Sequence, residues 1–333
     1  FIQKFSKRKK KNMNILVTGA AGFIGSHVSE YFTSMGDRVI GVDNFDPFYP
    51  VKFKNSNILN LKETGLFQFH DSDIRDSKAL DAIFSSSKID IVIHLAAKAG
   101  VRPSIDSVKE YYDVNVNGTL NLLESMRNHN ITRMLFASSS SIYGNNSKVP
   151  FSESDSVDNP ISPYASTKKG GELLCHVYTH LYKFDITCLR FFTVFGPRQR
   201  PDLAIHKFTR LIDEGNPIPF YGDGTTSRDY TYIKDIVNGI ACAAKHLEGY
   251  RTYNLGESHV IKLKTLVETI ENVTGKKAIL NHLPTQPGDV NATYADISKA
   301  KKEIGYDPKY DFETGIKNFV NWYYKNKSIL YQV

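Results

Sequence analysis

A tyrosine and a lysine in the segment Y-A-S-T-K, Tyr164 and Lys168, have the side chains and spacing for acid–base chemistry. At positions i and i+4 they share one face of a helix. A phenol with an ordinary pKa of about 10 is a poor base at neutral pH, but an adjacent ammonium stabilises the phenolate. The pattern predicts Tyr164 as a general base and Lys168 as its partner. Ser139, at the end of an apolar run, is expected to hydrogen-bond the reacting hydroxyl.

A glycine-rich turn, G-A-A-G-F-I-G, follows the strand-like run N-I-L-V-T and precedes a helical pattern. Glycines allow a tight turn and close backbone approach, and a helix N-terminus favours a pyrophosphate. The next apolar run ends in Asp43, whose carboxylate can bind ribose hydroxyls and would repel a 2′-phosphate. We therefore expect NAD rather than NADP, with its positive nicotinamide also favouring a Tyr164 phenolate. The expected cofactor contacts from the first two strands are Gly19, Gly22, Phe23, Ile24, Gly25, Asp43 and Asn44.

Two later strand ends complete the expected cofactor site. The segment D-S-D-I-R-D follows the third strand, and Asp73 and Ile74 within it could edge the adenine. The fourth strand runs into Leu95, Ala96 and Ala97, which are small enough to lie against the dinucleotide, although the two alanines could equally be packing residues.

A stiff loop, T-V-F-G-P-R-Q-R-P-D, extends from Thr193 to Asp202 and places two arginines between prolines. Proline fixes φ, and the rigid guanidinium fork suits a carboxylate or a phosphate. For Arg200 the structural alternative is a salt bridge to Asp202. For Arg198 it is an exposed position.

Strand and helix patterns alternate from Met13 to residue 192, which predicts an α/β fold with a doubly wound parallel sheet of the Rossmann type. Apolar runs suited to buried strands are N-I-L-V-T, R-V-I-G-V, L-F-Q-F-H, I-D-I-V-I-H-L-A, R-M-L-F-A and I-T-C-L-R-F-F. Helical patterns cover 23–35, 77–86, 107–129 and 163–183. We expect residues 13–192 to bind NAD and 193–333 to form a smaller α/β substrate domain, with a segment near 230–256 returning to the first.

The charge of the chain is concentrated at one end. The 333 residues carry a net charge of +7, of which six charges lie within residues 1–12. That arm is expected to be appended or disordered, with anionic lipid or an upstream membrane segment as the alternative. The near-neutral remainder argues against nucleic-acid binding, and no apolar stretch is long enough to cross a membrane. Three cysteines without paired spacing favour a reducing, cytoplasmic compartment, and we expect no metal site.

These motifs together resemble the extended short-chain dehydrogenase/reductase superfamily over essentially all of residues 13–325. The motifs are G-A-A-G-F-I-G, D-S-D-I-R-D, H-L-A-A, Y-Y-D-V-N-V-N-G-T, S-S-S-S-I-Y-G, Y-A-S-T-K, F-F-T-V-F-G-P-R-Q-R-P-D and R-D-Y-T-Y. Within the superfamily the chain most resembles nucleotide-sugar 4-epimerases, and among these the UDP-glucuronate 4-epimerases. The resemblance implies tightly held NAD, a UDP-sugar substrate and a homodimer formed through the helices at 107–129 and 163–183.

The resemblance also assigns roles to single residues. It makes Tyr164 the base, Lys168 its partner, Ser139 the contact to the substrate hydroxyl and Asn115 a helix residue at the cofactor site. Towards the nucleotide it places Arg228 on the diphosphate, Asp289 on the uridine ribose and Tyr221 near the uracil.

The residues around Ser139 favour one reaction over its relatives. A 4,6-dehydratase needs a carboxylic acid and a carboxylate beside that hydroxyl, whereas this chain has Ser140 and Ser141. These serines and Thr193 leave room for a 4-keto sugar to turn over. Galactose epimerases and UDP-xylose-forming decarboxylases usually have asparagine at the position of Thr193.

The resemblance further implies that Arg200 lies against a sugar carboxylate. There it would limit loss of CO2 from the 4-keto acid, which is a β-keto acid. The alternatives that stay open are a UDP-glucose or UDP-N-acetylglucosamine 4-epimerase, a UDP-glucuronate decarboxylase and a non-enzymatic NAD-binding regulator.

Overall fold

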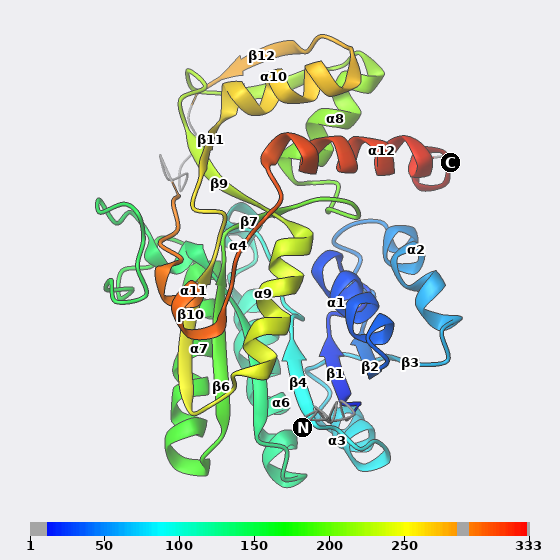
Figure 1. The fold of residues 1–333 in the computed structure, drawn as a ribbon, viewed down its shortest axis with the longest axis vertical. Helices are drawn as coiled ribbons and strands as arrows, with labels where there is room; N and C mark the ends of the chain where they lie inside the picture. Colours follow the sequence, from blue (N-terminus) through cyan, green and yellow to red (C-terminus); the bar gives the residue numbers. More distant parts are fainter. Residues whose placement is uncertain (1–11, 285–292, 332–333) are drawn as a thin grey trace, which may run out of the picture.

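The computed structural model describes residues 12–284 and 293–331. Its centre is a seven-stranded sheet in the order β10-β6-β5-β4-β1-β2-β3, in which every neighbouring pair is parallel (Figure 1). The strands are β1 (Asn14–Thr18), β2 (Arg38–Asp43), β3 (Phe67–Asp71), β4 (Ile91–His94), β5 (Arg133–Ser139), β6 (Asp185–Phe191) and β10 (Tyr250–Leu255). The chain reverses its direction of travel across the sheet between β1 and β4, where such folds form a ligand crevice. The predicted doubly wound α/β fold is confirmed.

Helices cover both faces of this sheet because its strands alternate between two apolar cores. Ile15 and Val17 of β1 belong to one core, and Leu16 belongs to the other. The first core includes α1 (Phe23–Ser34) and α9 (Ile233–Lys245), and the second includes α3 (Ser77–Ser86), α6 (Gly118–Asn128) and α7 (Pro163–Tyr182). Burial on both faces explains why the strands read as continuous apolar runs.

The helix predicted over 107–129 is instead three consecutive segments. These are α5 (Val108–Tyr112), a π-helical turn η1 (Asp113–Asn117) and α6. The π turn contains Asn115, which is buried and hydrogen-bonded outside its own helix. Two further α-helices before residue 192, α2 (Val51–Lys62) and α4 (Val101–Asp106), were not predicted.

Smaller elements lie beyond the carboxyl ends of the parallel strands, at the top of Figure 1. One sheet has the order β11-β9-β7 and the other pairs β12 with β8. The strands are β7 (Thr193–Phe195), β8 (Pro217–Tyr221), β9 (Ser227–Tyr232), β11 (Val260–Lys262) and β12 (Ile279–Leu283). The helices of this part are α8 (Ala204–Glu214), α10 (Leu263–Thr274) and α12 (Phe312–Tyr331), while α11 (Ser298–Ile304) lies near β10.

The chain leaves the large sheet after β6 and returns to it through β10, which pairs with β6. Residues 1–11 of the predicted basic arm lie outside the described residues. Among the described helices, none is both long enough and apolar enough to cross a membrane.

Candidate active site

A cavity of about 540 Å³ lies at the carboxyl edge of the large sheet. Its volume is within the range of small-molecule and cofactor sites. The structure places most of the predicted site residues in its wall, which contains Gly19, Gly22, Phe23, Ile24, Gly25, Asp43, Asn44, Asp73, Ile74, Leu95, Ala96, Ala97, Ser139, Ser140, Ser141, Tyr164, Lys168, Thr193, Arg200 and Arg228. The candidate cofactor residues and the candidate reacting residues therefore share one space.

The glycine turn has the geometry that a bound pyrophosphate requires. Gly19 has a φ of 72°, and a Cβ there would lie 2.8 Å from the amide nitrogen of Ala96. A Cβ on Gly25 would lie 2.0 Å from the carbonyl oxygen of Gly19, so the helix packs directly on the turn. No acidic residue stands in the first turn of α1. The N-terminus of α1 can therefore accept an anion.

Asp43 is buried at the end of β2 and firmly held. Its Oδ1 accepts hydrogen bonds from the Phe45 amide at 2.9 Å and from Lys54 Nζ at 3.2 Å, and its Oδ2 accepts one from the Ala21 amide. Lys54 comes from α2, which was not predicted, and it lines the same cavity. The carboxylate of Asp43 is thus held in one orientation at the wall of the cavity.

Asp73 and Asn44 form a polar edge at the same end of the cavity. The Asn44 amide donates to Asp73 Oδ2 at 2.8 Å. Hydrogen bonds from Arg75 and Asn44 lower the pKa of Asp73 to about 2 against the opposing effect of its partial burial. Asp73 therefore remains a hydrogen-bond acceptor throughout the ordinary pH range.

The loop after β4 is positioned by two polar side chains. Thr18 Oγ1 accepts hydrogen bonds from the amides of Leu95 and Ala96, both at 3.2 Å. Asn115 accepts from the Lys98 amide at 2.8 Å and donates to the Lys98 carbonyl at 3.0 Å. Asn115 is not among the lining residues, so the structure places this predicted cofactor residue behind the loop.

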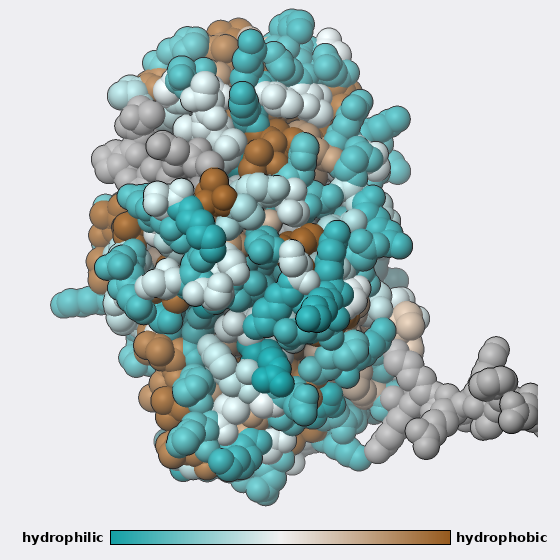
Figure 2. All heavy atoms as spheres, turned by 60° about the vertical axis from the view of Figure 1, so that its left-hand side comes forward, coloured by the Kyte–Doolittle hydropathy of each residue, from teal (hydrophilic) through white to brown (hydrophobic). Residues whose placement is uncertain are grey.

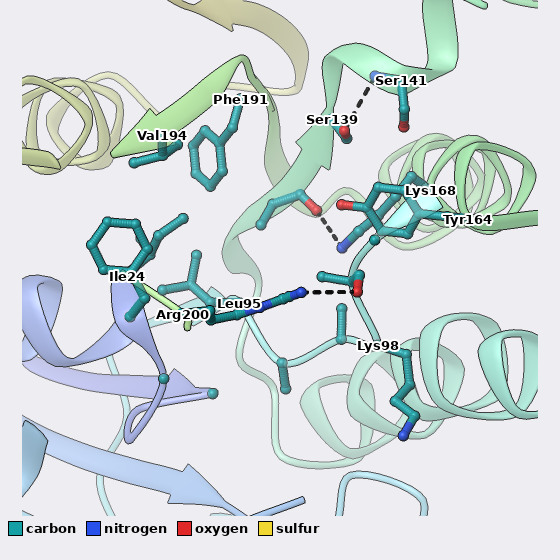
Figure 3. A pocket seen from close by; sticks show the side chains of 18 of the residues that line it. Ile24, Leu95, Lys98, Ser139, Ser141, Tyr164, Lys168, Phe191, Val194 and Arg200 are labelled. Carbon is teal, nitrogen blue, oxygen red and sulfur yellow. Dashed lines mark hydrogen bonds between the residues drawn. The ribbon is translucent and has the colours of Figure 1, made fainter. Parts of the chain in front are cut away.

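Ser139, Tyr164 and Lys168 come together where β5 ends and α7 begins (Figure 3). Helix α7 starts with Ser162 as its N-cap, whose side chain accepts from the Ala165 amide, and with proline in its first turn. This start places Tyr164 and Lys168 one turn apart. Lys168 Nζ donates to the Ala137 carbonyl at 2.8 Å, which anchors the helix to β5.

Burial shifts the pKa of both residues. It raises the pKa of Tyr164, while a hydrogen bond with Ser139 and the charge of Arg200 oppose that rise. Burial also lowers the pKa of Lys168 to about 8. The net direction for Tyr164 is opposite to the lowering expected from its lysine neighbour. Among the described residues, Ser139 and Arg200 favour the phenolate.

The two arginines of the T-V-F-G-P-R-Q-R-P-D loop have different environments. Arg198, with a φ of 67°, turns away from the cavity and pairs with Glu30 of α1. Arg200 lines the cavity, and its guanidinium lies 4.9 Å from the ring centroid of Phe48. Arg200 also forms the salt bridge to Asp202 that the sequence offered as the alternative to a ligand-binding role. The ion pair and the cavity position therefore coexist.

The predicted nucleotide contacts are only partly brought together. Arg228 of β9 lines the cavity. Tyr221 of β8 does not line it, and its ring lies 4.8 Å from the guanidinium carbon of Arg102. Asp289 lies outside the described residues.

The sequence patterns missed many of the lining residues, among them Phe48, Lys54 and Lys98. Lys98 Nζ pairs with Asp46 at 3.0 Å and with Glu110 at 2.9 Å. Its position directly after L-A-A was an available signal. Phe48 and Lys54 had no such signal, because they reach the cavity only through the packing of α2 and the segment before it.

Within the described residues, no group of three or more His, Cys, Asp or Glu side chains could hold a metal.

Comparison with known proteins agrees with this geometry. The family model described as GDP-mannose 4,6 dehydratase matches residues 16–319. The chain is 46% identical over 316 residues to a UDP-glucuronate 4-epimerase of Thermodesulfobacterium geofontis, covering 95% of this chain and 97% of that protein.

Two solved structures cover nearly the whole chain. A UDP-glucuronic acid 4-epimerase of Bacillus cereus, solved with UDP-glucuronic acid and NAD, has a TM-score of 0.89 and 37% identity, covering 94% of this chain and 99% of that one. A UDP-glucose 4-epimerase of Thermotoga maritima, solved with UDP-glucose, has a TM-score of 0.87 and 32% identity, covering 95% and 100%.

Proposed function

Since the chain belongs to the nucleotide-sugar epimerases of the extended short-chain dehydrogenase/reductase superfamily, we propose that it interconverts UDP-glucuronate and UDP-galacturonate by NAD-dependent epimerisation at C4. One observation carries the choice of substrate: Arg200 lines the same cavity as Ser139, Tyr164 and Lys168. A cation beside the reacting residues suits a sugar that carries a carboxylate. The likeness to the two UDP-glucuronate 4-epimerases supports the same choice.

The residues present fit NAD as the cofactor. The glycine turn and the N-terminus of α1 suit the pyrophosphate, and the fixed carboxylate of Asp43 suits the adenosine ribose. NAD held there would supply the hydride chemistry at C4 of the sugar, as reversible acceptor and donor. We assign residues 13–192, with β10, to NAD and residues from 193 onward to the nucleotide sugar.

The side chains of the chain itself handle the proton. Tyr164 removes the proton of the 4-hydroxyl, and Ser139 holds that hydroxyl by a hydrogen bond. Lys168 is fixed by the Ala137 carbonyl and supplies positive charge on the face of α7 that carries Tyr164. After the keto sugar has turned over, Tyr164 returns the proton to the new hydroxyl. The small side chains of Ser140, Ser141 and Thr193 leave space for the turn.

Dehydration is disfavoured by the positions of the acidic groups. Among the described lining residues, the carboxylates are Asp43, Asp46 and Asp73, which come from β2 and from the segments after β2 and β3. None stands beside Ser139, where a 4,6-dehydratase would need an acid to expel the leaving hydroxyl as water. Loss of CO2 is opposed by Arg200, because a carboxylate held by a guanidinium cannot rotate freely out of the ring plane.

The proposal is tested by incubating the protein with UDP-glucuronate and with UDP-glucose in separate reactions and following the products by NMR. We expect UDP-galacturonate from the first reaction and little conversion in the second. Conversion of UDP-glucose alone, or CO2 release as the main outcome, would contradict the proposal.

We also propose that two copies of the chain associate through α7 and the α4–α6 region. On α7, Leu173, Val177 and Leu181 are exposed at i, i+4 and i+8, with exposed fractions of 56%, 45% and 58%. The neighbouring segments expose further apolar side chains, which are Ile105, Val108, Tyr112 and Leu120. Figure 2 shows hydrophobic side chains gathered along one edge of the molecule. An apolar stripe on a surface helix is typical of an association face.

A further inference from the structure

The guanidinium of Arg200 already binds a carboxylate of its own chain. Its Nε donates to Asp202 Oδ1 at 3.0 Å, and its Nη2 donates to Asp202 Oδ2 at 2.7 Å. This is the two-bonded, side-on geometry in which an arginine binds an acid most strongly. Nη2 also reaches the Ala99 carbonyl at 3.4 Å. Among the described residues, none accepts a hydrogen bond from Nη1.

This pair conflicts with the role proposed for Arg200. While Asp202 is bound, the two side chains together carry no net charge, and only Nη1 remains to receive a sugar carboxylate. A second carboxylate beside the same guanidinium would also be repelled by Asp202. The Arg200 side chain is only 16% exposed, so water would screen that repulsion weakly.

Solvent and a helix N-terminus can both receive the Asp202 carboxylate once another acid displaces it from Arg200. The Asp202 side chain is 38% exposed, so solvent can receive the carboxylate. It also stands one residue before Leu203, the N-cap of α8. That helix has no side-chain cap and no acidic residue in its first turn, so its N-terminus offers the freed carboxylate a second favourable site.

From these contacts we propose that Asp202 is a specificity-determining residue, whose carboxylate holds Arg200 until the carboxylate of the sugar displaces it. The inference rests on the proposed function, because it takes UDP-glucuronate as the substrate. A sugar with an uncharged C6 group cannot make the same exchange. The affinity for UDP-glucuronate then depends on Asp202, whereas the affinity for UDP-glucose does not.

Calorimetric binding tests this exchange in the NAD-containing Tyr164→Phe protein, in which turnover should be too slow to disturb the measurement. Asp202→Asn keeps the shape of the side chain but removes its charge. We expect it to strengthen UDP-glucuronate binding about three- to tenfold, the range for the net contribution of one competing hydrogen bond. UDP-glucose binding should change less than about twofold on the same scale. Glu214→Gln, which removes an equal charge at the other end of α8, is the matched control.

Two outcomes overturn the exchange. Weaker UDP-glucuronate binding in Asp202→Asn would make Asp202 an orienting support for Arg200, and unchanged binding would mean that Asp202 does not compete. Asp202→Ser, whose side chain cannot bridge both guanidinium nitrogens of Arg200, repeats the test in case asparagine keeps the pair.

Arg200→Ala distinguishes failure of the exchange from failure of the proposed function. If it leaves UDP-glucuronate binding unchanged, the proposed acid site itself is wrong. If it weakens binding while neither Asp202 variant strengthens it, only the exchange is wrong.

Discussion

Tyr164 lies in a buried site, where water is excluded from the reaction. The same burial makes the phenol harder to ionise. Burial raises the pKa of Tyr164, while Ser139 and Arg200 oppose this rise. Arg200 therefore has two consequences: it supplies charge for a sugar acid, and it favours the phenolate. A change at Arg200 should for this reason affect turnover as well as substrate choice.

The first prediction concerns the phenol itself. Tyr164→Phe should fold and retain NAD but lose about 10²- to 10⁴-fold in kcat, because the proposed base for the proton of the sugar 4-hydroxyl is gone. Turnover of UDP-glucuronate by NMR and the NAD content of the purified protein measure the two effects. Tyr324→Phe, on the exposed side of α12, is the matched control and should keep normal activity. Near-normal turnover in Tyr164→Phe would refute the assignment of the base.

The sequence predicted those site residues whose position follows from local motifs. The glycine turn, Asp43 and the Tyr164–Lys168 pair each belong to a strand end or a helix start, so chain order alone places them at one edge of the sheet. Phe48 and Lys54 could not be found in this way, because their place in the cavity depends on tertiary packing. Asn115 was found, but its contact is with the Lys98 backbone.

At the level of elements, the π turn η1 is the feature that connects helix packing to the cofactor loop. Its Asn115 bonds both backbone groups of Lys98 and also donates to Thr167 Oγ1 of α7 at 3.0 Å. One side chain thus joins three elements around the cavity. A π turn is seldom kept without such a role, and these turns are frequent at functional sites.

The second prediction follows from this junction. Asn115→Ala should lower the free energy of unfolding by about 1–3 kcal/mol and reduce NAD retention, because the partly buried backbone groups of Lys98 lose their hydrogen-bond partner. Thermal unfolding and NAD content after gel filtration measure these effects. Asn117→Ala, on the exposed side of the same turn, is the control. If both variants retain NAD equally, Asn115 does not support the loop.

The elements were predicted where one physical signal dominates. Strands buried on both faces give unbroken apolar runs, which made most strands of the large sheet recognisable. The partly exposed edge strand β3 was recognised from its shorter run, L-F-Q-F-H. The continuous helix over 107–129 was wrong because a π turn adds no signature to the apolar pattern. Helix α2 was missed because its buried face includes Lys54 and Asn57, which a hydrophobic pattern does not register.

At the scale of the whole molecule, buried neutral histidines connect separate parts of the fold. His206 of α8 contacts the Gln199 carbonyl through Nδ1 at 2.5 Å and the Tyr331 hydroxyl through Nε2 at 2.7 Å. It therefore joins the arginine loop to the end of α12. Burial lowers the pKa of His206 to about 4 and that of His94 to about 3.

The third prediction is a stability that depends on pH. A histidine whose folded pKa is lowered contributes stability above the unfolded value of about 6.5, and the contribution is lost as pH falls towards 4. His206→Gln should lower the free energy of unfolding by about 1–3 kcal/mol at pH 7. Near pH 4.5 the difference in unfolding free energy between variant and parent should be smaller by a similar amount. Denaturant unfolding at both pH values measures it. Phe53 packs against the His206 ring and does not titrate. The control Phe53→Leu should therefore lower the free energy of unfolding by the same amount at both pH values. A His206→Gln difference that stays constant would contradict the prediction.

The last prediction concerns the assembly. If the apolar stripe on α7 is an association face, the protein should have twice its chain mass of 37.6 kDa in solution. The double change Leu173→Asp and Leu181→Asp should give monomers, because charges in the centre of an apolar interface lose hydration without gaining partners. Light scattering after gel filtration measures the mass. Leu59→Asp is the control, since Leu59 of α2 is 61% exposed and lies outside the stripe. A monomeric parent, or a double variant that stays dimeric, would show that this face is not the interface.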